Sequence, residues 1–156
     1  SSNIIENNII TVVNSSSSVT SYRDLDGARA GIVSDVALTA LQENASVYNS
    51  LASAQQYGTA QEAFTALDAG EIDAVVIDDF DFYTYENAAS YTVLSGVLDT
   101  IEYGFAFAKS DDYSSGFNEA VLEISSTDYS DEDTLTPLVE KYFGYADACV
   151  FEYESE

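Results

Sequence analysis

The sequence predicts an α/β protein, a three-layer lobe with a mainly parallel sheet between helices. Strand-like runs alternate with helix-like segments along most of the chain. Residues 72–77 are apolar apart from Asp73, as in a strand covered on both faces. Residues 59–62 (TAQE) form a capping box, which predicts a helix before that strand. Strands separated by helices make βαβ units, and such units give a parallel sheet.

The first part of the chain supplies the opening strands and the first helix. Residues 9–13 (IITVV) are β-branched and predict a strand, and Asp26-Gly27 marks a turn. Ser34 is placed to cap a helix in which Leu38 and Leu41 share one face. We therefore expect, in order, a strand at 9–13, an exposed loop at 14–18, a strand at 28–33 and a helix at 35–43 that ends near Asn44.

The second part continues the alternation and ends in helices. The capping box opens a helix that Gly70 ends, and Gly144 is a natural C-terminal cap of the last helix. The acids at 131–133, in the opening Ser130-Asp131-Glu132-Asp133, would lie at the positive end of that helix's dipole. We expect a weak strand at 54–57, the buried strand at 72–77, a helix at 79–88, a strand at 91–94, a buried strand at 103–108, and helices at 112–125 and 131–143.

Composition excludes several functions. The 156 residues include 28 acids and 4 bases, so the net charge is −24, and there is no His. Without imidazole there is no Ser-His or Cys-His pair, and four scattered bases cannot neutralise a phosphate track, so we expect no enzyme and no nucleic-acid partner. Hydrophobic residues make up 46% of the chain, which predicts a folded domain rather than an acidic tail. Cys149, a single cysteine, is free or pairs between chains.

Four segments follow one another in a recognisable order: 20–32 (TSYRDLDGARAGI), 62–78 (EAFTALDAGEIDAVVID), 103–111 (YGFAFAKSD) and 135–144 (LTPLVEKYFG). Each is a weak motif, but their order and spacing together resemble the C-terminal lobe of type II periplasmic solute-binding proteins, specifically the extracellular amino-acid-binding family (family 3). The resemblance covers about residues 9–144. The start at Ser1-Ser2-Asn3, with no leader, suggests a processed or excised chain.

The resemblance implies an organisation and partners. Residues 1–156 would be a single lobe with a core at 9–100, a returning strand and C-terminal helices at 101–146, and an acidic tail at 147–156. It implies an extracytoplasmic location, no cofactor and no metal. The expected partners are a small polar solute and either a membrane transporter permease or the missing first lobe. Self-association through the C-terminal helices is a further expected interaction, because their apolar faces have lost that lobe.

The resemblance also assigns candidate ligand-binding residues. Asp78 matches the family's acid that binds the ligand ammonium, and the alternative is that it caps the next helix. Ser34 and Asp35 stand where the family often has Ser-Gly-Thr-Thr to bind a carboxylate, and an acid there repels an anion; the alternative for Ser34 is a plain helix cap. Tyr103 matches a position near the hinge, and its alternative role is packing.

Other motifs are weaker. Residues 24–27 (DLDG) faintly resemble a calcium loop, but a turn is the better interpretation because the further ligands are lacking. The cluster of Asp78, Asp79 and Asp81 could bind a divalent cation through its carboxylate oxygens, but acids at this density occur by chance in so acidic a chain. Asn14-Ser15-Ser16 and Asn44-Ala45-Ser46 match the glycosylation sequon, which matters only in a secretory context.

These observations lead to one hypothesis and one alternative. The hypothesis is an extracytoplasmic solute-binding protein, or part of one, that captures a small polar, amino-acid-like ligand for a membrane ABC transporter. The alternative is an extracellular sensory or assembly module that keeps the lobe fold without transport or ligand binding. The missing first lobe and residues 35–37 (DVA) favour the alternative.

Overall fold

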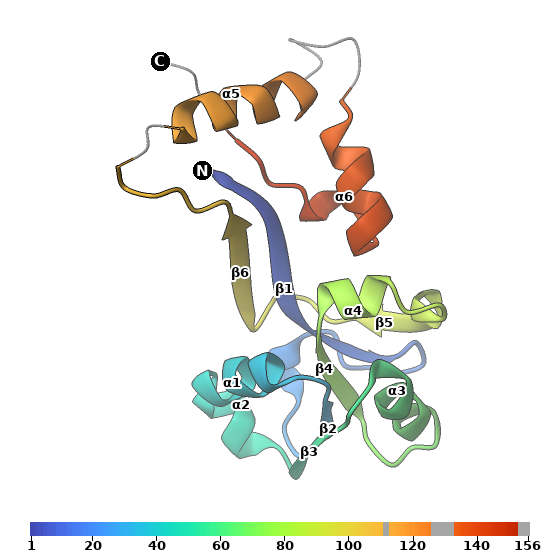
Figure 1. The fold of residues 1–156 in the computed structure, drawn as a ribbon. Helices are drawn as coiled ribbons and strands as arrows, with labels where there is room; N and C mark the ends of the chain where they lie inside the picture. The colour runs from blue at the N-terminus through green and yellow to red at the C-terminus, as the bar shows by residue number, and fades with distance from the viewer. Residues whose placement is uncertain (111–112, 126–132, 153–156) are drawn as a thin grey trace. The chain divides into compact units, whose positions relative to one another are not determined.

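The computed structural model describes residues 1–110, 113–125 and 133–152. They form two compact units, Asn8–Thr100 and the pair of segments Ser1–Asn7 and Ile101–Glu156 (Figure 1). Strands β1 (Asn3–Asn14) and β6 (Asp99–Gly104) each contribute residues to both units. No helix among the described residues has the length and apolar character needed to cross a membrane.

The unit Asn8–Thr100 is an α/β fold, as predicted. After β1 it contains η1 (Tyr22–Asp24), β2 (Arg29–Ile32), α1 (Asp35–Glu43), α2 (Ala45–Ser50), β3 (Ser53–Gln56), α3 (Ala60–Asp68), β4 (Ala74–Asp78), α4 (Asp79–Tyr83), η2 (Ala88–Ser90) and β5 (Tyr91–Val93).

The sheet has the order β3-β2-β4-β1-β5, and β6 also pairs with β1. Strand β2 is parallel to β3 and β4, whereas β1 is antiparallel to β4 and β5. The sheet is therefore mixed, and its parallel part is the β2–α1–β3–α3–β4 segment that the alternation of elements predicted. Strand β1 reverses direction because a loop with one 3-10 turn, rather than a crossover helix, joins it to β2.

Helices α1 and α3 lie on opposite sides of β2 and β4, which gives the three layers (Figure 1). Strand β4 is central, and Val75 and Ile77 are fully buried, so the predicted strand covered on both faces is confirmed. The α3 side of the sheet packs around Phe64, whose ring lies 4.4 Å from that of Tyr91 and 4.8 Å from that of Tyr85. The core of this side comprises Ile10, Val12, Ala63, Phe64, Ala66, Leu67, Ile72, Val75, Ile77 and Phe82.

The predicted ends of α1 and α3 are confirmed. Ser34 caps α1 by accepting a 3.0 Å hydrogen bond from Ala37 N–H. Thr59 caps α3 by accepting from Glu62 N–H, while the Glu62 carboxylate accepts from Gly58 N–H. Gly70 has φ +70°, which permits the chain to turn after α3.

Helix α4 is shorter than predicted. It ends at Tyr83 rather than near residue 88, and the Thr84 hydroxyl donates 2.6 Å to Phe80 O at its end. Residues beyond this point leave the helix axis because Tyr85 stacks on Phe64 of the core. A separate 3-10 turn, η2, follows before β5.

In the second unit the predicted buried strand at 103–108 is wrong. Strand β6 covers Asp99–Gly104 and is largely exposed, and residues 105–108 are not in a strand. Phe105 and Phe107 pack instead on Phe117 of α5 (Ser114–Ser125), with ring centres 4.9 Å and 5.4 Å apart. The apolar residues at 105–108 therefore do not pair in a sheet, and two of them pack their side chains on α5 instead.

The last helix, α6 (Leu135–Phe143), packs on α5 and is followed by η3 (Ala146–Ala148). The predicted starts at 112 and 131 and the acids at 131–132 lie outside the described residues. Asp133, the residue before the cap position Thr134, accepts hydrogen bonds from Leu135 and Thr136 N–H at the start of α6. The hydrogen bonds from Thr136 lower the pKa of Asp133. Gly144 ends the helix with φ +91°, as predicted.

The apolar faces of α5 and α6 are partly covered. Val121 and Val139 are buried, whereas Ile124, Leu138 and Tyr142 are 41%, 46% and 65% exposed. Cys149 is a free, half-buried thiol. This unit therefore presents apolar side chains on its surface in the structure as it stands.

Candidate functional site at the carboxyl edge of the sheet

The candidate site begins at the edge of the sheet where the parallel strands β2 and β4 both end. Val33, just after β2, donates to Val76 O of β4 at 3.1 Å, so the two strand ends are adjacent. Ser34 follows β2, and Asp78 is the last residue of β4. Open α/β sheets bind ligands at this edge, because helix N-termini and loop side chains converge there.

Ser34 and Asp35 both act at the start of α1. Ser34 is the helix cap, and its hydroxyl oxygen is occupied by Ala37 N–H. Asp35 is exposed, and its carboxylate accepts 2.9 Å from Nε2 of Gln56 at the end of β3. A third strand therefore contributes to this edge, and Gln56 fixes the orientation of the Asp35 carboxylate.

Asp78 is half-buried and caps α4, with Oδ1 accepting 3.1 Å from Asp81 N–H. The cap interpretation of Asp78 is thus confirmed. Among the residues that the structure describes, none donates a hydrogen bond to its Oδ2. The pKa of Asp81 is raised, first because burial disfavours its charged form and second because of the negative charge on Asp78. Asp79 is 2% exposed and belongs to the core rather than to the edge.

The edge is negative. Within Asn8–Thr100 the two basic side chains are Arg23, which lies over the Tyr22 ring in η1, and Arg29. Arg29 is at the start of β2, where it pairs with Asp73 at 2.8 Å, so this ion pair lies at the opposite edge of the sheet. The Arg29 guanidinium lowers the pKa of Asp73 by hydrogen bonding. Asp35, Asp78 and Asp81 therefore have no cationic neighbour within their own unit.

The predicted site residues divide between the units. Ser34, Asp35 and Asp78 come together at one edge, whereas Tyr103 lies in β6 of the other unit and is 46% exposed. Sequence reasoning missed Gln56, because its contact with Asp35 depends on the parallel register that sets Ile32 opposite Gln56. No group of three or more acidic, His or Cys side chains among the described residues is arranged to hold a metal ion.

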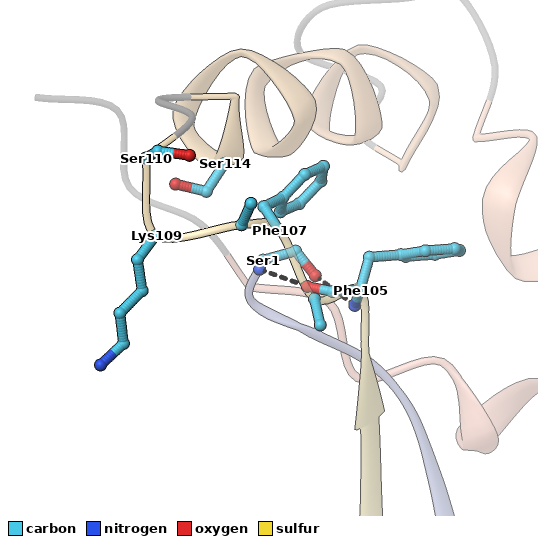
Figure 2. A pocket seen from close by; sticks show the side chains of 8 residues that line it. Ser1, Phe105, Phe107, Lys109, Ser110 and Ser114 are labelled. Atoms are coloured by element: carbon cyan, nitrogen blue, oxygen red, sulfur yellow. Dashed lines mark hydrogen bonds between the residues drawn. The ribbon is translucent and has the colours of Figure 1, made fainter.

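The other unit contains a hollow of about 470 Å³ between Ser1 and the residues that lead into α5. Figure 2 shows Phe107 beside it and the Lys109 side chain directed away from Ser110 and Ser114. The Ser1 ammonium donates to Phe105 O at 2.8 Å, so the local amine is already paired. None of the candidate residues lines this hollow.

These features define a lobe of the type II periplasmic-binding-protein fold, and comparison with solved structures confirms it. The chain superimposes on a polar amino-acid ABC uptake transporter substrate-binding protein from Streptococcus thermophilus with a TM-score of 0.76 and 19% identity, covering 96% of this chain and 58% of that one. It matches an ABC uptake transporter substrate-binding protein from Streptococcus pneumoniae with bound histidine at 0.66 and 25% identity, covering 96% and 62%.

A ligand-binding core that is not described as part of a transporter shares the fold as well. The GluR0 ligand-binding core from Nostoc punctiforme, in complex with L-glutamate, matches at a TM-score of 0.60 and 23% identity, covering 92% of this chain and 64% of that one. No family model matches the chain. No curated protein matches it at the sequence level.

The comparisons support the resemblance at the level of the fold. The similar structures described here are binding proteins, and one of them is the substrate-binding protein of a polar amino-acid ABC uptake transporter. This chain spans about three fifths of the length of these structures, 58–64% in the three described. The other part of their length has no counterpart in this chain.

Proposed function

We propose that this chain is part of an extracytoplasmic solute-binding protein that captures a small polar, amino-acid-like ligand for a membrane ABC transporter. The observation that carries the proposal is the acidic carboxyl edge formed by Asp35, Asp78 and Asp81 on a lobe of this fold. Substrate-binding proteins of amino-acid transporters with the same fold support it. The proposal includes no catalytic step.

The charge of the edge selects the ligand class. A carboxylate that already accepts one N–H, as Asp78 does, can accept a further hydrogen bond from an ammonium or guanidinium group. A ligand carboxylate placed beside Asp35 would meet repulsion that the N-terminus of α1 offsets only in part. A cationic or zwitterionic ligand is therefore favoured over an acidic one, with Asp78 and Asp35 on its cationic groups and Ser34 beside them.

The rest of the site would come from elsewhere. We propose that residues 9–100 form the core of the second lobe, that 101–146 form the returning strand and C-terminal helices, and that 147–156 form an acidic tail. A first lobe would close over the ligand, with Tyr103 near the hinge. Such a lobe, or a second copy of this chain, would cover the exposed Ile124, Leu138 and Tyr142. A transporter permease would be the partner of the closed form.

A second candidate is an extracellular sensory or assembly module with the same lobe. Two observations favour it: the fold is shared with the GluR0 ligand-binding core, and Asp35 stands where the resemblance implies an anion-binding residue. The two candidates differ in the need for a permease. Uptake of the identified ligand by cells that lack the encoding gene separates them, because loss of uptake supports the transporter and normal uptake supports the module.

Calorimetric titration of the chain tests the ligand class. A ligand bound at one exposed edge makes few contacts, and the entropy cost of association offsets most of their free energy. We therefore expect dissociation constants no lower than ~1 mM, about −4 kcal/mol, and tighter binding of basic amino acids and polyamines than of acidic amino acids. Asp78→Asn should weaken this binding, and Asp73→Asn, a matched substitution at the opposite edge, should leave it unchanged. Micromolar binding of an acidic amino acid that Asp78→Asn does not alter would contradict the proposal.

A further inference from the structure

Two sequons occur in the chain, and the structure places them in different environments. Asn14-Ser15-Ser16 lies at the end of β1, where the chain enters an exposed serine-rich turn. Asn44-Ala45-Ser46 lies between α1 and α2. A sequon functions as an acceptor only if its amide nitrogen can be reached and altered without loss of the fold.

The Asn14 amide has the arrangement that this requires. Its Oδ1 accepts hydrogen bonds from the Ser16 hydroxyl at 2.8 Å and from Ser16 N–H at 3.1 Å. Its Nδ2 donates no hydrogen bond to any part of the chain that the structure describes. The side chain is thus held by its oxygen while its nitrogen stays open. Donors on Oδ1 also stabilise the negative charge that develops there when Nδ2 loses a proton.

Asn44 has the opposite arrangement. Its Nδ2 donates to Ala40 O at 2.9 Å and to Leu98 O at 3.1 Å, so both amide protons are used within the fold. These bonds join the end of α1 to the segment before β6. A sugar on this nitrogen would remove one donor and leave a partly buried carbonyl unpaired, which destabilises a protein.

The position of Asn14 is compatible with ligand binding. Strand β1 runs antiparallel to β4 with Ile9 opposite Asp78, so Asn14 lies about five residues, or ~16 Å, along β1 from the acidic edge. An open hollow of about 310 Å³ adjoins Asn14, walled by Ser16, Ser17, Leu67, Asp68, Gly70, Ile72 and Asp73.

We propose that Asn14 is an acceptor for an N-linked glycan and that Asn44 is not. The donor is a lipid-phosphate-linked oligosaccharide, brought by an oligosaccharyltransferase. The Asn14 Nδ2 forms a bond to the anomeric carbon, the bond from that carbon to the lipid phosphate breaks, the phosphate leaves with the electron pair, and the Nδ2 proton passes to a base. The inference goes beyond solute binding and rests only on the extracytoplasmic location contained in the proposed function.

Secretion of the full chain from a eukaryotic host, followed by intact-mass measurement and peptide mapping, tests the proposal. Enzymatic removal of N-glycans in heavy-oxygen water marks each former acceptor as a labelled Asp. The expected result is a label at Asn14 and none at Asn44. Asn14→Gln and Ser16→Ala should abolish the modification, whereas Ser16→Thr and Asn44→Gln should retain it.

The variants also separate modification from folding. Ser16 is exposed, and Ser16→Ala and Ser16→Thr should be secreted in similar amounts and melt at similar temperatures, so a difference in glycan reports the acceptor itself. An unmodified chain, secreted beside a control protein that is fully glycosylated, would overturn the inference. A label at Asn44 in folded protein would overturn its structural basis. Ligand titration is independent of both results.

Discussion

Asp78 offers a substitution pair that separates its charge from its role as a helix cap. In the structure its Oδ1 accepts from Asp81 N–H at the start of α4. Asn is as good a cap as Asp, so Asp78→Asn keeps the hydrogen bond and removes the charge. Asp78→Ala removes both.

The expected magnitudes follow from the geometry. Loss of the cap in Asp78→Ala should cost about 1 kcal/mol, within a range of ~0.5–2. For a chain of this size that lowers the melting temperature by roughly 2–4 °C. In Asp78→Asn the lost attraction to the helix dipole, ~0.3–1 kcal/mol, is offset by relief of the repulsion with Asp81, so we expect a change within ~0.5 kcal/mol.

Urea unfolding and a carboxyl NMR titration measure the two effects. Because the Asp78 charge is one cause of the raised pKa of Asp81, that pKa should fall in Asp78→Asn while remaining above its ordinary value, since burial is the larger cause. Equal destabilisation by the two substitutions would refute the cap assignment. An unchanged pKa of Asp81 in Asp78→Asn would refute the electrostatic coupling at the edge.

Three further predictions concern stability. Phe64→Ala should cost about 3–5 kcal/mol in urea unfolding, because Phe64 is fully buried against Phe82, Tyr85 and Tyr91; a loss below ~2 kcal/mol would contradict this core. The pairing with Arg29 lowers the pKa of Asp73 in the folded protein, so the stability that this pair adds should be present above pH 3.8 and be lost as the pH falls further below that value. The melting temperatures of wild type and Asp73→Asn should therefore differ above pH 3.8 and converge at lower pH, and a difference that persists at low pH would contradict this. The net charge of −24 should destabilise the folded chain by repulsion between its acidic side chains. The melting temperature should therefore rise with NaCl as the Debye length falls from ~10 Å at 0.1 M to ~3 Å at 1 M, and a melting temperature that does not change with NaCl would show that this repulsion is already compensated.

The elements with strong local signals could be predicted from the sequence. The bounds of α1 match the prediction, because Ser34 and Asn44 mark its ends by local chemistry. Residues 59–62 similarly fixed the start of α3, and the continuous apolarity of β4 identified the central strand. In each case the determining contacts lie within a few residues of one another or follow from burial alone.

The errors arose where distant contacts decide the structure. The apolar run at 103–108 indicated burial, but its partner, Phe117, comes from a helix further along the chain. Helix α4 stops early because Tyr85 packs on Phe64, a contact across 21 residues that helix propensity does not encode. For the candidate site, Asp78 and Ser34 were found from strand ends, whereas Gln56 required the register of β2 with β3.

The most direct test of the central claim is to locate the binding surface by NMR. Amide shifts of the ¹⁵N-labelled chain would be followed while L-arginine or a diamine is added to ~10 mM, about ten times the lowest expected dissociation constant. The account predicts that the amides of Ser34, Asp35, Gln56 and Asp78 shift together along one binding curve while those of residues 14–18 at the opposite edge stay fixed. Shifts confined to the opposite edge or to residues 101–152, or saturable shifts that Asp78→Asn leaves unchanged, would contradict a cation-binding site at the carboxyl edge.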